Sequence, residues 1–236
     1  MYLSRIQLRF NALRPAMLEK WQNESVYASH QWLWQLFPDQ DARQFLFRQE
    51  KNGGFFVLSA VPPVADHALF NIETRPYTPQ LSRGALLDFQ LRANPVITRG
   101  GKRSDVLMNA RYQAKMEGIP QERWLDLQHQ AALRWLEAQG EKHGFELVVP
   151  ESDALDDWAG CGGDEEAPPS AKAAVMGYTQ HRLTRKDGES PIAFSSVDFA
   201  GALRVTDPQA FTDALYRGLG KSKAMGCGLL MVKRRR

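Results

Sequence analysis

Four glycines occur within eleven residues near the end of the chain, with two lysines between them. This glycine-rich loop runs from Gly218 to Leu230 and reads Gly-Leu-Gly-Lys-Ser-Lys-Ala-Met-Gly-Cys-Gly-Leu-Leu. Glycine accepts positive φ and lets another stretch of backbone approach closely, so this loop restricts how the rest of the chain can pack. Two interpretations stay open. In the first, Gly220 and Gly226 turn backbone amides toward an anion such as phosphate, beside Lys221 and Lys223. In the second, the loop is a helix C-cap followed by a tight turn.

Part of the loop resembles a phosphate-binding P-loop, but the rest of that motif is missing. Gly220-Lys221-Ser222 would need a further glycine at position 215, where Leu215 stands. A P-loop also follows a strand and opens a helix. This loop follows an expected helix and enters the apolar run 229–232. We therefore exclude an ATP-binding loop.

The composition is that of an ordinary globular protein, with 43% hydrophobic and 24% charged residues in a chain of 236. No apolar run reaches the length of a membrane span, and the N-terminus alternates like a strand rather than a signal peptide. Cys161 and Cys227 lie far apart, which predicts neither a disulfide framework nor a zinc site. We expect a cytoplasmic protein that has no contact with a membrane.

The formal net charge of +3 understates how basic most of the chain is. Seven acidic residues and no lysine or arginine lie between 150 and 170. Without this acidic segment, 30 basic residues face 20 acidic ones, a net charge of +10. Such a body suits a polyanionic partner, and a merely solvated basic surface is the alternative.

The first 80 residues have the pattern of a split βαβ unit of the ferredoxin-like kind. Alternation over 2–10 predicts a strand. A short helical turn over 15–21 and a helix over 25–37 are expected next, the latter ending before Pro38. The remaining elements expected are a hairpin with strands at 45–47 and 55–61, a poorly formed helix, and a strand over 68–74.

The pattern then starts again, so we expect an α+β fold of two tandem ferredoxin-like βαββαβ domains, spanning 1–80 and 81–236. The elements expected in the second domain are, in order, strand 85–97, helix 122–139, strand 145–149, hairpin strands 173–184 and 193–205, and a last helix begun by Asp207 and Pro208.

Two basic segments of the second domain are candidates for binding a polyanion. One is a loop expected over 98–118, and the other is the turn of the hairpin. Their basic residues are Arg99, Lys102 and Arg103 in the loop, and Arg182, Arg185 and Lys186 in the hairpin.

The best catalytic candidates are Tyr27 and His30. Three residues apart on a helix, they share a face. The expected helix start would also place them among unpaired amides, at the end of the dipole that favours phosphate. Histidine titrates near neutral pH and moves protons without a metal. The alternative is that both residues merely border the apolar side of the helix.

The other histidines and the acidic residues give no site. His181 lies on the basic hairpin, where contact with RNA or solvent is the better interpretation. Acidic residues cluster only between 150 and 170, without the fixed spacing of a two-metal nuclease. No metal and no cofactor is therefore expected.

The chain resembles the CasE family of CRISPR-associated endoribonucleases, which belong to the RAMP superfamily and serve type I-E Cascade. Four stretches spread over nearly the full length carry the resemblance, in the family's order. They are Met1-Tyr2-Leu3-Ser4, Ser29-His30-Gln31 through Leu36-Phe37-Pro38, Leu91-Arg92-Ala93-Asn94-Pro95, and the glycine-rich loop.

The resemblance implies metal-independent cleavage of precursor RNA at the base of the CRISPR repeat hairpin. It implies 2′,3′-cyclic phosphate and 5′-hydroxyl ends, and partners that are the hairpin and other Cascade subunits. The family's catalytic histidine maps to His30, and a tyrosine three residues earlier maps to Tyr27. Some relatives carry an arginine where Gln31 stands. Lys223 or an arginine of the 99–103 loop is therefore the candidate that stabilises the phosphate.

Two other classes of protein remain as alternatives. A non-catalytic RAMP subunit of an effector complex would share the glycine-rich loop without an active histidine. An RNA-binding module of the RRM kind would share the fold, but it needs exposed aromatic residues on its central strands, and the chain does not match that motif.

Overall fold

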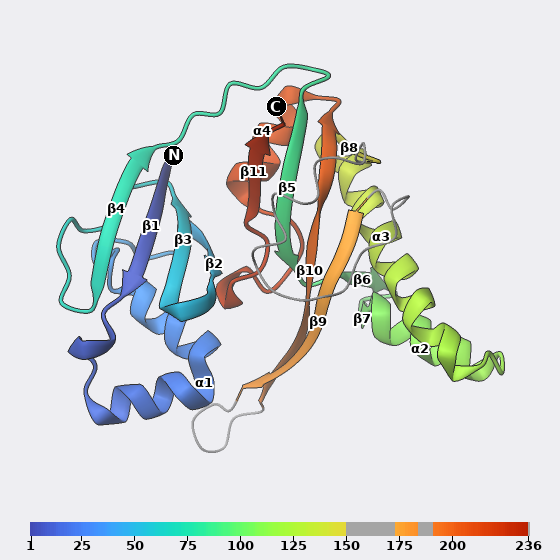
Figure 1. Cartoon of the computed structure of the whole chain (residues 1–236), viewed down its shortest axis with the longest axis horizontal. Coiled ribbons are helices and arrows are strands. Elements are labelled where there is room, and N and C mark those ends of the chain that lie inside the picture. Colours follow the sequence, from blue (N-terminus) through green and yellow to red (C-terminus); the bar gives the residue numbers. More distant parts are fainter. Residues whose placement is uncertain (150–172, 184–190, 236) are drawn as a thin grey trace.

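Two antiparallel β-sheets lie next to one another and are joined by an extended link (Figure 1). The computed structural model describes residues 1–149, 173–183 and 191–235. The link over 77–85 connects β4 (Phe70–Pro76), in the first sheet, with β5 (Leu86–Ala93), in the second. The predicted α+β class with two ferredoxin-like units is confirmed.

The first unit has the strand order β2-β3-β1-β4, and every neighbouring pair is antiparallel. Its other strands are β1 (Tyr2–Leu8), β2 (Phe45–Gln49) and β3 (Gly54–Ser59). No helix forms over 60–69, between β3 and β4, so the expectation of a poorly formed helix was wrong. Pro62 and Pro63 fix φ and remove two backbone donors there, which opposes a helix.

A single helix, α1 (Pro15–Trp34), replaces the two shorter helices that the sequence predicted. Pro15 stands at the first helical position, where its missing N–H costs nothing. After Pro15 the helix contains neither proline nor glycine, the two residues that break helices most strongly. The sequence analysis began a new helix at Ser25, but a serine costs only a fraction of a kcal/mol inside a helix.

The second unit has the order β11-β5-β10-β8, with β9 also paired to β10. Besides β5, the strands of this sheet are β8 (Phe145–Val148), β9 (Ala173–Leu183), β10 (Ile192–Val205) and β11 (Leu230–Arg234). The helices α3 (Trp124–His143) and α4 (Pro208–Arg217) pack against it. The expected N-cap is present, because the Asp207 side chain accepts from the backbone N–H groups of Gln209 and Ala210.

Strands β8 and β9 occupy the same position in this sheet, end to end. Both are antiparallel to β10. Val148, the last residue of β8, is opposite Ala202, and Ala173, the first residue of β9, is opposite Gly201. The two strands therefore continue one another along β10, although the chain between them contains the acidic segment, which lies outside the described residues.

The predicted loop over 98–118 is mostly regular structure. Strands β6 (Val96–Arg99) and β7 (Lys102–Asp105) form a hairpin, and α2 (Val106–Met116) follows it at once. Asp105 caps α2 by accepting from the N–H groups of Leu107 and Met108 at 2.8 and 3.0 Å. The loop interpretation missed this cap because the basic residues around it outweighed the short apolar pattern of 106, 107 and 114.

Each unit has its own apolar core. One core gathers α1 against β1, β2 and β3, and the other gathers α3 and α4 against β5 and β10. The described 3-10 helices are η1 (Phe10–Ala12), η2 (Lys51–Gly53), η3 (Gln121–Arg123) and η5 (Lys223–Met225). Within the described ranges, every helix is too short or too polar to cross a membrane.

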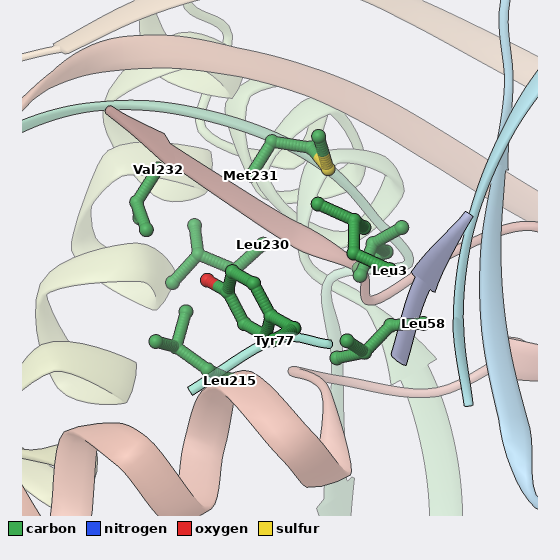
Figure 2. Close-up of a pocket in the computed structure, with 8 residues that line it drawn as sticks. Leu3, Leu58, Tyr77, Leu215, Leu230, Met231 and Val232 are labelled. Atoms are coloured by element: carbon green, nitrogen blue, oxygen red, sulfur yellow. The ribbon is translucent and has the colours of Figure 1, made fainter. Parts of the chain in front are cut away.

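A third, smaller apolar cluster joins the two units. It contains Leu46 of β2, Leu58 of β3 and Leu229 of the glycine-rich loop. Figure 2 shows the small cavity beside it, where the ring of Tyr77 lies between side chains of both units. The glycine-rich loop is thus part of the contact between the sheets.

Candidate functional site

His30 lies near the C-terminal end of α1, four residues before Trp34. The expectation that helix N-terminal amides and the positive dipole end serve His30 was therefore wrong, because α1 begins fifteen residues earlier, at Pro15. The half-buried imidazole stacks on the Trp34 indole, with centroids 6.0 Å apart and planes 3° from parallel. Trp34 packs in turn on Phe45 of β2, at 5.8 Å. Aromatic packing, rather than a helix terminus, positions this histidine.

Tyr27 lies beside a cation that the sequence did not single out. The Lys20 ammonium is 5.5 Å from the centroid of the Tyr27 ring, within cation–π range. The same ammonium donates to Oε1 of Gln31 at 2.5 Å. Lys20 therefore brings positive charge to the part of α1 that carries Tyr27 and Gln31.

The glycine-rich loop approaches α1, because η5 contacts both α1 and β2. Its glycines are needed for contact with the protein itself. A Cβ on Gly226, which has φ +78°, would lie 3.1 Å from the Phe47 ring. A Cβ on Gly220 would lie 3.2 Å from the Asn94 carbonyl oxygen. These contacts support the tight-turn interpretation for the two glycines, and phosphate binding by their amides stays a prediction.

The two lysines of the loop have different surroundings. Lys223 donates from Nζ to the carbonyl oxygen of Arg217 at 2.6 Å, at the C-terminal end of α4. Burial lowers the pKa of Lys223, and the charges of Arg43 and Lys221 lower it further. Lys221 is exposed and pairs through its backbone with Asn94.

Arg43, which the sequence analysis missed, links the histidine to the glycine-rich loop. Burial lowers the pKa of His30, and the charge of Arg43 lowers it further. Because the same arginine lowers the pKa of Lys223, it lies within electrostatic reach of both. The structure thus brings His30, Arg43 and Lys223 together from α1, the loop before β2, and η5. A lone arginine in a short polar loop gives almost no sequence signal.

One of the two predicted basic segments lies away from His30. Arg99, Lys102 and Arg103 belong to the β6–β7 hairpin, which Figure 1 shows beside α2 and away from α1. Arg182 is exposed on β9, while Arg185 and Lys186 lie outside the described residues. The 99–103 segment is therefore not part of the His30 site. The sequence analysis named Lys223 or an arginine of this segment as the group that stabilises the phosphate, and of these Lys223 remains.

A cluster of ion pairs fixes the two units behind the site. Arg92 of β5 donates from Nε and Nη2 to the two Asp198 carboxylate oxygens, each at 2.9 Å, and from Nη1 to the Gln49 carbonyl oxygen of β2. Arg48, also of β2, lies 3.9 Å from the Asp198 carboxylate. Burial raises the pKa of the nearby Cys227 thiol to about 12, so it is protonated and unsuited to act as a nucleophile.

The described residues contain no group of three or more histidines, cysteines and acidic residues that could hold a metal ion. The functional groups described above for the region of His30 are an imidazole, a phenol and nearby cations. The tandem ferredoxin-like units and the basic residues Lys20, Arg43 and Lys223 indicate a protein that binds a polyanion.

Comparison with known proteins gives the family. The family model described as CRISPR associated protein matches residues 1–234. The Cascade subunit CasE of Escherichia coli K12 is 30% identical over 218 residues, which cover 89% of this chain and 92% of that one. The CRISPR-associated endoribonuclease Cse3 of Thermus thermophilus is 29% identical over 163 residues, which cover 67% of this chain and 60% of Cse3. The chain belongs to the CRISPR-associated protein family, as a member of the CasE type.

Solved structures support the fold. Cse3 bound to a 19-nucleotide RNA superposes with a TM-score of 0.69 at 24% identity, covering 98% of both chains. Cas6e from Escherichia coli K-12 superposes with a TM-score of 0.55 at 22% identity over the whole of both chains. At this identity the likeness establishes the arrangement of the two ferredoxin-like units, and it carries no argument about individual site residues.

Proposed function

We propose that this protein is an endoribonuclease that processes CRISPR precursor RNA. The observation that carries the proposal is the 30% identity with CasE over nearly the full length of both chains. The name of Cse3, an endoribonuclease solved with bound RNA, points the same way. We further propose that it cuts at the base of the repeat hairpin and stays bound to the mature RNA as a subunit of Cascade.

The proposed reaction is an internal transesterification. The ribose 2′-oxygen just upstream of the cut attacks its own phosphate, so a 2′-O–P bond forms and the P–O5′ bond breaks. One proton leaves the 2′-hydroxyl and one reaches the departing 5′-oxygen. The products are a 2′,3′-cyclic phosphate and a 5′-hydroxyl. Because the nucleophile belongs to the substrate and needs only proton transfer and charge stabilisation, the proposal includes no metal.

His30 is the residue we propose for proton transfer. Its lowered pKa keeps the imidazole neutral at neutral pH, which suits a general base that takes the 2′-hydroxyl proton. Such a role is worth on the order of 100- to 10,000-fold in rate. Tyr27, three residues earlier on α1, would donate a hydrogen bond to the phosphate or hold the attacking hydroxyl.

Incubation of the purified protein with its repeat RNA in EDTA tests the proposal. We expect cleavage at one phosphodiester, with a cyclic phosphate on the upstream fragment. The variant His30→Ala should not cleave, whereas the matched variant His129→Ala, on α3, should cleave normally. Binding without cleavage by the parent protein would instead establish a non-catalytic RNA-binding RAMP subunit.

A further inference from the structure

Arg43 has a fixed place beside the proposed catalytic histidine. It precedes Phe45 by two residues, in the loop between α1 and β2. Phe45 is 5% exposed and packs on Trp34, the residue on which His30 stacks. The backbone that carries Arg43 is therefore held by the same aromatic group that orients the imidazole.

The guanidinium of Arg43 lacks the partners that other arginines of this region have. Its Nη1 atom is buried and donates no hydrogen bond within the described chain. Among the described residues, no carboxylate forms an ion pair with it, whereas Arg48 and Arg92 share Asp198. A buried donor without an acceptor is unfavourable, and an uncompensated cation more so. A bound anion would remove both penalties.

Arg43 acts electrostatically on two titratable groups that belong to other elements. Burial lowers the pKa of His30 on α1 and of Lys223 on η5, and the charge of Arg43 lowers each pKa further. Lys20 adds a further cation on α1, beside Tyr27. Because the Lys223 ammonium already donates to the Arg217 carbonyl, the unpaired fork of Arg43 is the better donor for an incoming phosphate.

We infer that Arg43 binds the scissile phosphate and stabilises the extra negative charge that its non-bridging oxygens gain as the 2′-oxygen attacks. The inference rests on the proposed function, because it assigns a residue to that reaction. A guanidinium offers two parallel N–H donors to two phosphate oxygens, which a lysine cannot do. Burial and, after it, the charge of Arg43 favour neutral His30, and a bound phosphate offsets the contribution of Arg43.

The variants Arg43→Gln and Arg43→Lys test this role, with Arg14→Gln as a control. Arg14 is exposed immediately before α1, so its loss removes the same charge from the same unit without touching the site. Single-turnover cleavage should fall at least about 100-fold in Arg43→Gln and recover only in part in Arg43→Lys. Affinity for a repeat hairpin with a 2′-deoxy nucleotide at the cut should change by no more than a few-fold. Parental cleavage by folded Arg43→Gln would overturn the inference.

A second measurement tests phosphate binding by Arg43 without a cleavage assay. Titration of inorganic phosphate, followed through the His30 ring resonances by NMR, should shift those resonances in the parent and in Arg14→Gln but much less in Arg43→Gln. The pKa of His30 in the free protein should also be higher in Arg43→Gln. Equal phosphate shifts in parent and Arg43→Gln would overturn the inference. If the parent cleaves no RNA, the proposed function fails, and this titration still tests phosphate binding by Arg43.

Discussion

The imidazole of His30 lies parallel to the Trp34 indole, one helical turn further along α1. This stacking fixes the plane of the imidazole before RNA arrives. This preorganisation is what a proton-transfer group needs, since a misplaced base loses most of its effect.

Replacing His30 by alanine should abolish cleavage and leave hairpin affinity within a few-fold. The expected loss is on the order of 100- to 10,000-fold in single-turnover rate, because one proton-transfer group is removed. Affinity should survive, since His30 is neutral in the free protein and adds no charge toward the RNA backbone. Equal rates for parent and His30→Ala would remove His30 from the mechanism.

The pH dependence of cleavage should report His30. Because burial and then Arg43 lower its pKa, the imidazole stays neutral below the ordinary value of 6.5. A neutral base is active and a protonated one is not, so kcat/KM should fall on the acid side, with an apparent pKa below 6.5. The measurement is the initial rate at subsaturating RNA between pH 4.5 and 8. A midpoint above 6.5 would contradict the assignment of His30 as the base of the free protein.

RNA binding should weaken steeply with salt, because the body outside the acidic segment carries +10. Each neutralised phosphate contributes a slope of roughly −0.7 to −0.9 in log K against log salt. Fluorescence anisotropy with a labelled hairpin measures this slope. A flat salt response would argue against basic surfaces as the RNA contact.

A version of the protein that lacks Asp153 to Glu166 should cleave like the parent.

Gly226→Val should impair both stability and cleavage. Valine at φ +78° costs about 1–3 kcal/mol in backbone strain, and its Cβ would lie 3.1 Å from the Phe47 ring. The matched control is Gly118→Val, which has φ +68° and no heavy atom within 4 Å of its Cβ. Thermal unfolding and single-turnover cleavage compare the two. If Gly226→Val only melted earlier and cleaved normally below its melting point, the loop would be a structural turn.

Lys223→Ala should lower stability slightly and slow cleavage. It removes an exposed hydrogen bond to the Arg217 carbonyl, worth about 0.5–1.5 kcal/mol, and one cation near Arg43. Lys221→Ala, on an exposed neighbour, controls for charge alone. If folded Lys223→Ala binds and cleaves RNA like the parent, the role of Lys223 is only to cap the C-terminal end of α4.

Local patterns predicted most of the fold. The alternation of β1, the Asp207 cap of α4 and the turn between β2 and β3 depend on neighbours in sequence, and all three formed as expected. Helix α1 was divided wrongly at Ser25, and α2 was missed because the basic residues around it outweighed its apolar pattern. These errors concern weak local preferences that the tertiary structure overrides.

The candidate site was predictable only in part. His30 and Tyr27 could be chosen because they share a helix, whereas Arg43 enters through the packing of Phe45 on Trp34. Phe45 and Trp34 belong to different elements, and their spacing in the sequence does not predict that they are in contact. The glycine-rich loop was chosen for its composition, but two of its partners, Phe47 and Asn94, lie far from it in the sequence.

The registers of β8 and β9 show how the chain accommodates its acidic segment. Val148 and Ala173 face consecutive residues of β10, so the chain leaves the sheet and re-enters it at neighbouring points, running in the same direction. In the sequence, the segment between Val148 and Ala173 therefore interrupts what is otherwise one strand. A peptide bond from Val148 to Ala173 would close that strand without reordering the sheet. The same junction could receive a fluorescent domain or an affinity tag, because its two ends are already adjacent.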